Sequence, residues 1–126
     1  MKPLVLLAVA ALGLAAAPAV SSDPQDLVGT WTVDLRPTPD APAYLQPFVV
    51  SAVDEDVISG TFYGSTIQNT QINADWDGVH FAFETSDGGS RYITVGRLMD
   101  GVLEGRTYSP DRGLLQPWRA IRAETG

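Results

Sequence analysis

Few side chains in this sequence could do chemistry, and the first to consider is the single histidine, His80. A histidine can serve as a general base or as a metal ligand, but either role needs further groups beside it in a cleft. The strand pattern described below places His80 on the outer face of a sheet, opposite Asp75. We therefore interpret these two residues as a surface His–Asp pair rather than as a catalytic or metal site.

Three consecutive acidic residues, Asp54-Glu55-Asp56, could bind calcium. A calcium ion needs six or more oxygen ligands, and one short turn does not supply them. The segment is more typical of an acidic, solvated hairpin tip. The chain also has no cysteine, which excludes disulfide scaffolds, thiol catalysis and cysteine-ligated metal sites. We expect neither a metal ion nor a cofactor.

Nucleophilic and acid–base catalysis also lack support in the sequence. Serine and threonine are plentiful, but none lies in a nucleophile-elbow pattern, and no second histidine is present to activate one. The chain has no Gly-rich phosphate loop. Acid–base catalysis by carboxylates needs two of them facing a pocket, and the predicted interior contains none. The sequence therefore predicts no catalytic residues and a protein that is not an enzyme.

One group of side chains could bind a ligand. Its hydroxyl groups lie together at one end of the β-barrel that the strand pattern below predicts. Phe83 and Trp118 would supply apolar contact to a ligand, and the hydroxyl and amide groups would orient its polar end. Tyr44 lies in the long connection 37–46, which would act as a lid. Such residues could equally fill a narrow barrel, with the hydroxyls bonding one another or water. The predicted ligand-binding residues are Tyr44, Phe83, Thr85, Tyr92, Thr94, Thr107, Ser109, Gln116 and Trp118.

The composition restricts the classes of protein to consider. The chain has 126 residues, which is one domain's worth. Fifteen acidic residues against eight basic ones give a net charge of −7, and nucleic acid as a partner requires the opposite balance. Hydrophobic residues make up 44% and charged residues only 18%, which excludes a disordered polyelectrolyte. We therefore expect a small, acidic, globular domain that does not bind nucleic acid.

The N-terminus has a pattern of its own. A single positive charge at Lys2 precedes about fourteen mostly apolar residues and the small-residue sequence Ala17-Pro18-Ala19. This pattern is typical of a secretory signal peptide covering 1–19, which leaves no stable membrane anchor after cleavage. We expect export, to the periplasm or to the extracellular space. The mature chain would then consist of an N-terminal extension, 20–28, and one β-barrel domain, 29–123.

The rest of the chain is predicted to be all-β. Short alternating runs rich in Val, Ile, Thr and aromatic residues are separated by turn signals roughly every 8–12 residues. Asp77-Gly78, Gly88-Gly89 and Asp100-Gly101 favour tight hairpins, and only the connection 37–46 is long. Such a chain folds as an eight-stranded antiparallel up-and-down β-barrel, which removes the sheet edges. The predicted strands are 30–36, 47–53, 57–64, 68–76, 79–86, 91–99, 102–109 and 114–122.

The tight turns also fix which residues face each other across neighbouring strands. On the outer face, Arg97 and Arg119 would both flank Glu104, which marks the solvated side. On the inner face, one row would place two large rings beside two glycines, as expected for a narrow interior. That row consists of Phe81, Gly96, Gly105 and Trp118.

The two ends of this barrel are predicted to differ. One end would be plugged by apolar side chains, whereas the other end holds the hydroxyl groups. The turn at 54–56 can have two or three residues, so the pairing leaves open whether Phe62 or Tyr63 points inward. The plugging residues are predicted to be Trp76, Val79, Leu98, Leu103 and Ala120.

Gly29-Thr30-Trp31 opens the first predicted strand, one long connection follows it, and short hairpins make up the remainder. This layout resembles the calycin barrels, which comprise lipocalins, fatty-acid-binding proteins and avidins. The resemblance implies that Trp31 closes one end of the barrel and that Arg122 packs on it, a cation–π contact worth about 0.5–2 kcal/mol. Val33 and Pro37 stand where avidins place polar ligand-binding groups, so biotin is not supported.

The sequence therefore predicts an exported, calycin-like barrel that binds one small, largely apolar ligand at its open end, without catalysis. Two alternatives stay open. The barrel could be a protein-binding module, such as a small protease inhibitor that uses the segment 20–26 as an N-terminal trunk. It could also be a filled structural barrel without a ligand.

Overall fold

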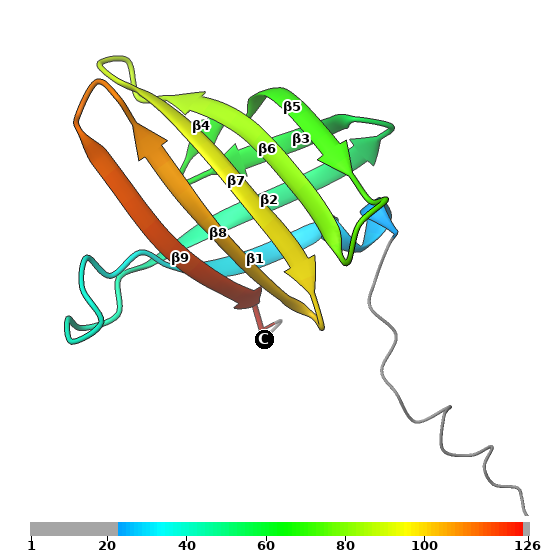
Figure 1. Ribbon diagram of the computed structural model, residues 1–126, viewed down its shortest axis with the longest axis horizontal. Coiled ribbons are helices and arrows are strands. Elements are labelled where there is room, and N and C mark those ends of the chain that lie inside the picture. The colour runs from blue at the N-terminus through cyan, green and yellow to red at the C-terminus, as the bar shows by residue number, and fades with distance from the viewer. Residues whose placement is uncertain (1–22, 125–126) are drawn as a thin grey trace, which may run out of the picture.

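The computed structural model describes residues 23–124, which form one antiparallel sheet curled into a nearly closed barrel (Figure 1). The predicted all-β antiparallel barrel is therefore confirmed. The predicted signal peptide, 1–19, lies outside the described residues. A short 3₁₀ helix, η2 (Pro24–Leu27), precedes the sheet. The strands are β1 (Gly29–Asp34), β2 (Leu45–Asp54), β3 (Val57–Phe62), β4 (Ser65–Thr66), β5 (Gln68–Asn73), β6 (Val79–Ser86), β7 (Arg91–Met99), β8 (Val102–Ser109) and β9 (Leu114–Arg122).

The sheet has nine strands rather than the eight predicted, because the predicted strand 57–64 ends early. Tyr63 and Gly64 form a tight turn in which both residues have positive φ, 53° and 80°. The two-residue strand β4 then returns along β3, with Ser65 opposite Phe62. This turn answers the question that the sequence left open: Phe62 is buried inside the barrel and Tyr63 is exposed.

Two features close the sheet into a barrel. The first is the position of β1, which pairs with both β2 and β9. The second is a side chain at the gap between β3 and β5, where the sheet has no backbone ladder. Thr70 Oγ1 donates to the carbonyl oxygen of Asp56 (2.5 Å) and accepts from the backbone N–H of Ile58 (3.2 Å). This side chain ties the edge strand β5 to the start of β3.

The predicted pairing of strands β6 to β9 is confirmed residue by residue. Phe81 lies opposite Gly96, Gly96 opposite Gly105, and Gly105 opposite Trp118. The two rings cover the two glycines, since a Cβ on Gly96 would lie only 2.6 Å from Phe81 Cζ. The absence of a side chain at these two positions therefore makes room for the rings.

The predicted pairing of β5 with β6 is wrong by two residues. Phe81 lies opposite Ile72, because the turn between these strands is longer than the predicted Asp77-Gly78. The Asn73 side-chain oxygen accepts the backbone N–H of Asp75 at 2.9 Å. Asn side chains compete with the ladder for backbone groups in this way, and the turn consequently starts early.

The longer turn corrects two further predictions. Trp76 is 73% exposed and does not plug the end of the barrel. His80 lies opposite Asn73 rather than Asp75, and its Nε2 lies 3.0 Å from the carbonyl oxygen of Asp77. The expected His–Asp pair is thus replaced by a contact with the backbone.

Five aromatic rings fill the centre of the barrel. Within this cluster, neighbouring ring centroids lie 5.4–6.0 Å apart, a spacing that favours aromatic packing. Each of the five side chains is at most 5% exposed. They belong to Phe48, Phe62, Phe81, Phe83 and Trp118.

The end of the barrel at which β1 begins is closed by η2 and by Trp31. Leu27 is fully buried there, and the Trp31 indole donates to its carbonyl oxygen at 2.9 Å. The Arg122 guanidinium lies 4.2 Å from the centre of the Trp31 ring and donates to the carbonyl oxygens of Val28 (2.8 Å) and Asp26 (2.5 Å). The expected packing of Arg122 on Trp31 is confirmed, and four of the five predicted plugging residues are buried.

We predict that Gly105→Ala lowers the free energy of unfolding by about 1–3 kcal/mol, the usual effect of overpacking a core. The new methyl group would lie 2.6 Å from the Val95 carbonyl oxygen and would overlap the Trp118 indole. Gly89→Ala is the control, because a Cβ there meets nothing closer than an Asp87 oxygen at 3.7 Å. Urea unfolding, monitored by tryptophan fluorescence, measures the free energy of unfolding of both variants. Equal stabilities would show that the rings do not depend on the glycines.

We also predict that Arg122→Met lowers the free energy of unfolding by about 2 kcal/mol, because it removes a cation–π contact and two charged hydrogen bonds. The rate of amide hydrogen exchange at Leu27 should also rise in this variant. Arg91→Met is the matched control, since that exposed guanidinium makes only a 3.7 Å ion pair with Asp111. Unchanged exchange at Leu27 would contradict a role for Arg122 in holding η2 in place.

Candidate functional site

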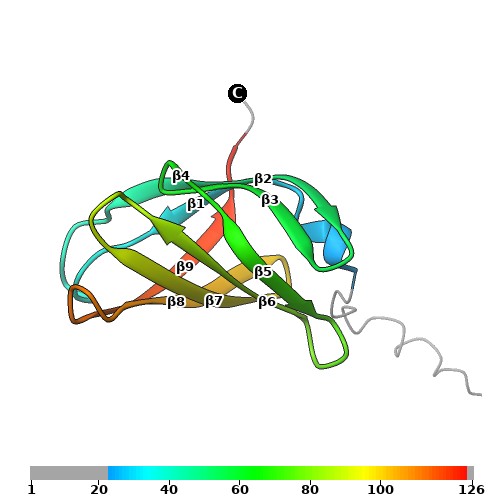
Figure 2. The ribbon, with the colours of Figure 1, turned by 90° about the horizontal axis from the view of Figure 1, so that it is seen from above.

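The end of the barrel opposite η2 carries three connections, 35–44, 87–90 and 110–113 (Figures 1 and 2). In Figure 1 they lie toward the left, with η2 at the right. Aromatic and charged side chains gather around this end, which we call the rim. The rim residues are Tyr44, Tyr63, Asp87, Tyr92 and Arg112.

Two of the rim tyrosines contact each other. The hydroxyl groups of Tyr44 and Tyr63 are hydrogen-bonded, and their rings meet edge to face with centroids 6.0 Å apart. The hydrogen bond with Tyr44, together with partial burial, raises the pKa of the Tyr63 phenol. The Tyr63 phenol is therefore a neutral hydrogen-bonding group at pH 7. Tyr44 and Tyr63 are each about half exposed, at 44% and 48%.

The third rim tyrosine is held by a charged pair. The Tyr92 hydroxyl donates to Asp87 Oδ2 at 2.8 Å and accepts from Arg112 at 3.1 Å. Asp87 also accepts the backbone N–H groups of Gly89 (2.9 Å) and Ser90 (2.8 Å). These backbone donors and Tyr92 lower the pKa of Asp87 to about 2. The Tyr92 ring is thus fixed in position by two neighbouring turns.

Beneath the rim lies a set of buried hydroxyl groups. Thr85, Thr94, Thr107 and Ser109 are all at most 6% exposed. Thr94 and Thr107 are hydrogen-bonded to each other at 2.8 Å, and the Trp118 indole donates to Thr107 at 3.1 Å. The structure therefore brings together these four predicted residues on the interior side of the rim.

The Ser109 hydroxyl is the most isolated of these groups. Ser109 is fully buried, and its Oγ has no hydrogen-bond partner among the described residues. A buried hydroxyl without a partner costs about 1–3 kcal/mol, so nearly all such groups in proteins are satisfied by protein, water or ligand. The register of β7 and β8 continues past Ile93↔Tyr108 and places Ser109 opposite Tyr92. An unsatisfied donor and acceptor thus lies directly below the rim.

The remaining predicted residues have other positions. Phe83 and Trp118 belong to the packed aromatic centre and are 1% and 4% exposed. Gln116 donates to the carbonyl oxygens of Arg36 and Pro117, at 2.8 Å each. The Gln116 amide therefore anchors the connection between β1 and β2. The rings of Phe83 and Trp118 form the floor beneath the rim.

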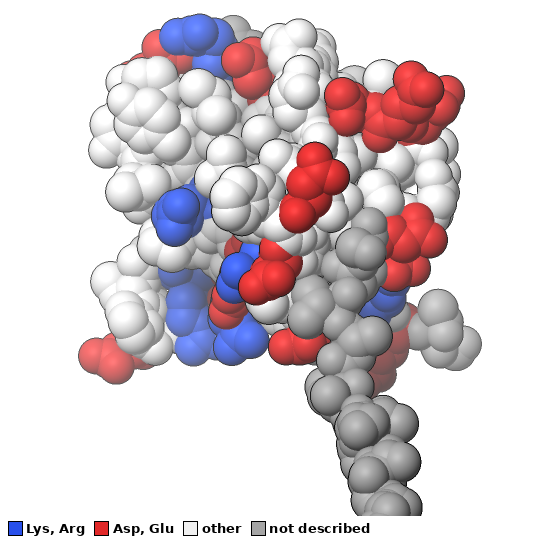
Figure 3. Space-filling model, turned by 45° about the vertical axis from the view of Figure 1, so that its right-hand side comes forward, with Lys and Arg blue, Asp and Glu red and all other residues white. Residues whose placement is uncertain are grey.

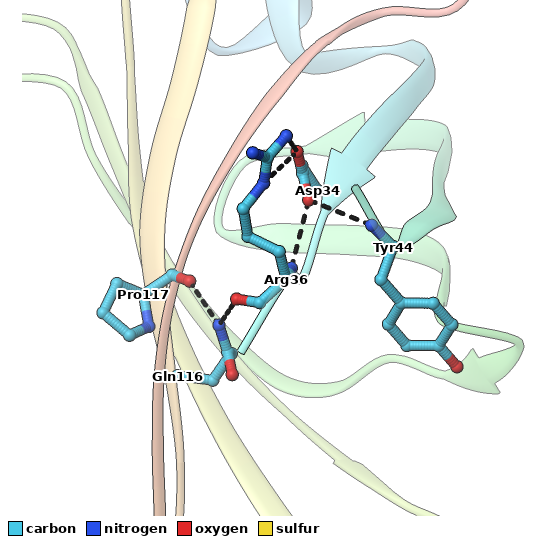
Figure 4. Close-up of polar contacts among 5 residues, drawn as sticks. All are labelled: Asp34, Arg36, Tyr44, Gln116 and Pro117. Carbon is cyan, nitrogen blue, oxygen red and sulfur yellow. Dashed lines mark hydrogen bonds and ion pairs between the residues drawn. The ribbon is translucent and has the colours of Figure 1, made fainter. Parts of the chain in front are cut away.

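The connection 35–44 is anchored by one carboxylate, as Figure 4 shows. Asp34 Oδ2 accepts from Arg36 Nε (2.9 Å) and from its terminal nitrogen (2.6 Å). Asp34 Oδ1 accepts the backbone N–H groups of Arg36 (3.0 Å) and Tyr44 (3.2 Å). The bond with Arg36 is the main reason why the pKa of Asp34 is lowered to about 2. The anchor fixes Tyr44 at the rim.

The sequence does not identify Tyr63, Asp87 or Arg112 as rim residues. Tyr63 is missed because the turn length at 54–56 leaves its direction undecided. Asp87 and Arg112 lie in turns, where the alternation of a strand no longer sets the direction of a side chain. The signal that could have found Asp87 is its position before two glycines, which favours an Asx-type turn.

The rim offers a ligand hydrogen bonds and aromatic surface. Three phenols and one guanidinium surround it, and one unsatisfied hydroxyl lies below. Within residues 23–124, no group of three or more His, Cys, Asp or Glu side chains is placed to hold a metal ion. In the same part of the chain, no helix has the length and apolarity that a bilayer crossing requires.

Comparison with protein-family models, with curated proteins and with solved structures gives no match for this chain. The interpretation of the rim therefore depends on its geometry.

We predict that Asp34→Asn increases proteolysis and amide exchange in the connection 35–44 at neutral pH. Because the folded pKa of Asp34 is about 2 and its ordinary value is 3.8, its stabilising effect is complete above pH 4 and is lost as the pH falls toward 2. The difference in proteolysis and amide exchange between wild type and variant should therefore decrease as the pH falls from 4 to 2. Asp40→Asn, in the same connection, is the control. A difference in proteolysis or exchange that is as large at pH 2 as at neutral pH would contradict this account.

Proposed function

We propose that this protein binds one small molecule at the rim of its barrel and does so without catalysis. The observation that carries the proposal is the Ser109 hydroxyl, which among the described residues is the one side-chain polar atom that is both inaccessible to solvent and without a hydrogen-bond partner. A ligand lying across the rim, with its polar group directed toward Ser109, would supply the missing hydrogen bond. Such a hydrogen bond would orient the polar end of the ligand.

The rim side chains indicate the chemical character of the rest of the ligand. Tyr44, Tyr63 and Tyr92 present aromatic surface and hydroxyl groups, and tyrosine combines large contact area with few rotatable bonds. Arg112, hydrogen-bonded to Tyr92, adds one positive charge. These groups favour a small, largely apolar molecule with one polar group.

The aromatic centre limits how far a ligand can enter. Phe83 and Trp118 are packed against other rings within 5.4–6.0 Å, so the barrel below the hydroxyl groups is filled. A long acyl chain would have to displace these rings. We therefore propose that the ligand is short and lies across the rim rather than along the barrel axis.

The protease-inhibitor alternative has less support from the geometry. It requires a free N-terminal trunk, whereas Asp26, in the described part of that segment, and the adjacent Leu27 are held against the barrel by Arg122 and Trp31. Gln25 also donates to the carbonyl oxygen of Val53 at 2.7 Å. Residues 23–28 act as a plug for the closed end.

Ser109→Ala tests the proposal, because the hydroxyl should have opposite effects on stability and on binding. Removing a buried hydroxyl without a partner should raise the free energy of unfolding by about 1 kcal/mol. The same change should weaken ligand binding about fivefold, the value of one lost hydrogen bond. Ser59→Ala, at an exposed position in β3, should change neither.

Ligands would be found by screening small amphipathic molecules with amide NMR, together with native mass spectrometry for co-purified molecules. Binding should shift the resonances of Ser109, Tyr92 and Tyr44 and leave those of Trp31 unchanged. Screening hits that shift no rim resonance would refute the proposal. A Ser109→Ala variant that is less stable than wild type would do the same, because the hydroxyl would then have a structural partner.

A further inference from the structure

A broad groove of about 1340 Å³ crosses the outer face of strands β5 to β9. Strands β5 to β8 each contribute three consecutive residues to it, and β9 contributes four. In each triplet of β5 to β8, the outer two residues point to solvent and the middle one points into the barrel. Gly96 and Gly105 are the middle residues of β7 and β8, so backbone forms the floor there. Pro37, Thr38 and Pro39 of the connection after β1 close one end.

Two cross-strand rows of outward side chains form the walls of the groove. The first row is rich in charge, and successive members lie opposite each other in the sheet. The second row runs parallel to it and is mostly uncharged. The first row is Asn73, His80, Arg97, Glu104, Arg119 and Asp34, and the second is Gln71, Ala82, Val95, Arg106 and Pro117.

The groove has a charge opposite to that of the chain as a whole. Four of the eight basic residues line it, together with only two of the fifteen acidic ones. In Figure 3 several basic side chains lie together at the lower left, while most acidic side chains are spread over the centre and right of the view. The basic residues in the groove are Arg36, Arg97, Arg106 and Arg119.

Two of these guanidinium groups are available to a partner. Arg36 is bound to Asp34 at 2.6 Å, and Arg119 lies 3.4 Å from Glu104. By contrast, the side chains of Arg97 and Arg106 have no ion-pair or hydrogen-bond partner within the described part of the chain. They are diagonal neighbours on β7 and β8, because Arg97 lies opposite Glu104 and Arg106 lies two residues further along.

We propose that this groove binds an acidic segment of a partner protein in extended conformation. Four inter-strand spacings of about 4.8 Å separate β5 from β9, which gives about 19 Å, or room for roughly six extended residues. Carboxylates of the segment would pair with Arg97 and Arg106, since guanidinium groups bind carboxylates through two parallel hydrogen bonds. Val95 and Pro117 would contact apolar side chains in the same segment.

The geometry favours a separate partner over a second copy of this chain. The most acidic stretch of the chain, Asp54-Glu55-Asp56, forms the turn between β2 and β3, with Glu55 at a positive φ of 54°. A turn of this shape cannot lie extended in the groove. Strands β6 to β9 of the groove are each paired on both sides, so along them a partner is recognised by side chains and not by strand addition.

The experiment is a selection from a random displayed-peptide library against the full mature chain, with counter-selection against the Arg97→Gln/Arg106→Gln double variant. Selected peptides should contain several Asp or Glu residues, and their affinity should fall as ionic strength rises. Each single variant should weaken binding of a selected peptide about tenfold, and Arg91→Gln, which removes the same charge outside the groove, should not. Circular dichroism confirms that every variant is folded.

Three results would overturn the proposal: peptides that lack acidic residues, peptides that bind the double variant as well as they bind wild type, and no peptide specific for wild type. Self-association that the double variant abolishes, without peptide binding, would assign the groove to contacts between copies and would also overturn it. The rim ligand is a separate matter, because Arg97→Gln leaves Tyr92 and Ser109 untouched.

Discussion

The placement of two aromatic rings on two glycines is the interaction on which the rest of this barrel depends. A ring can lie flat against a neighbouring strand only where that strand carries no Cβ, and Gly96 and Gly105 provide two such positions side by side. Phe81 approaches from one flanking strand and Trp118 from the other. The centre is therefore filled from within, and any ligand is restricted to an end or to the outer face.

The two ends of the filled barrel have opposite physical characters. At the closed end the polar groups of Trp31 and Arg122 are matched to backbone carbonyl oxygens, and the contacts serve stability. At the rim Tyr44 and Tyr63 stay half exposed and the Ser109 hydroxyl is unsatisfied. Proteins tolerate such a cost mainly where function needs the group, because stability and function compete for the same residues. The asymmetry is therefore a reason to look for function at the rim.

The sequence predicts the fold well where local turns determine the pairing. Asp100-Gly101 is a two-residue turn, so the register across it follows by counting residues. This counting correctly predicts that the two glycines lie beside the two aromatic rings. The same counting fails before β6, because the Asn73 side chain starts the turn early. It also leaves Tyr63 undecided and does not reveal that Ser109 lacks a partner. That last property depends on the positions of all neighbouring atoms, which no local pattern encodes.

The groove and the aromatic centre share one backbone, and this gives the groove a fixed shape. The segments around Gly96 and Gly105 form its floor on the outside and the seat of the rings on the inside. Rings packed at close distance resist displacement, and the floor is held by full pairing with neighbouring strands. A binding surface that is rigid before its partner arrives loses little conformational entropy on association. The packing that closes the interior to ligands thus preorganises the outer face for one.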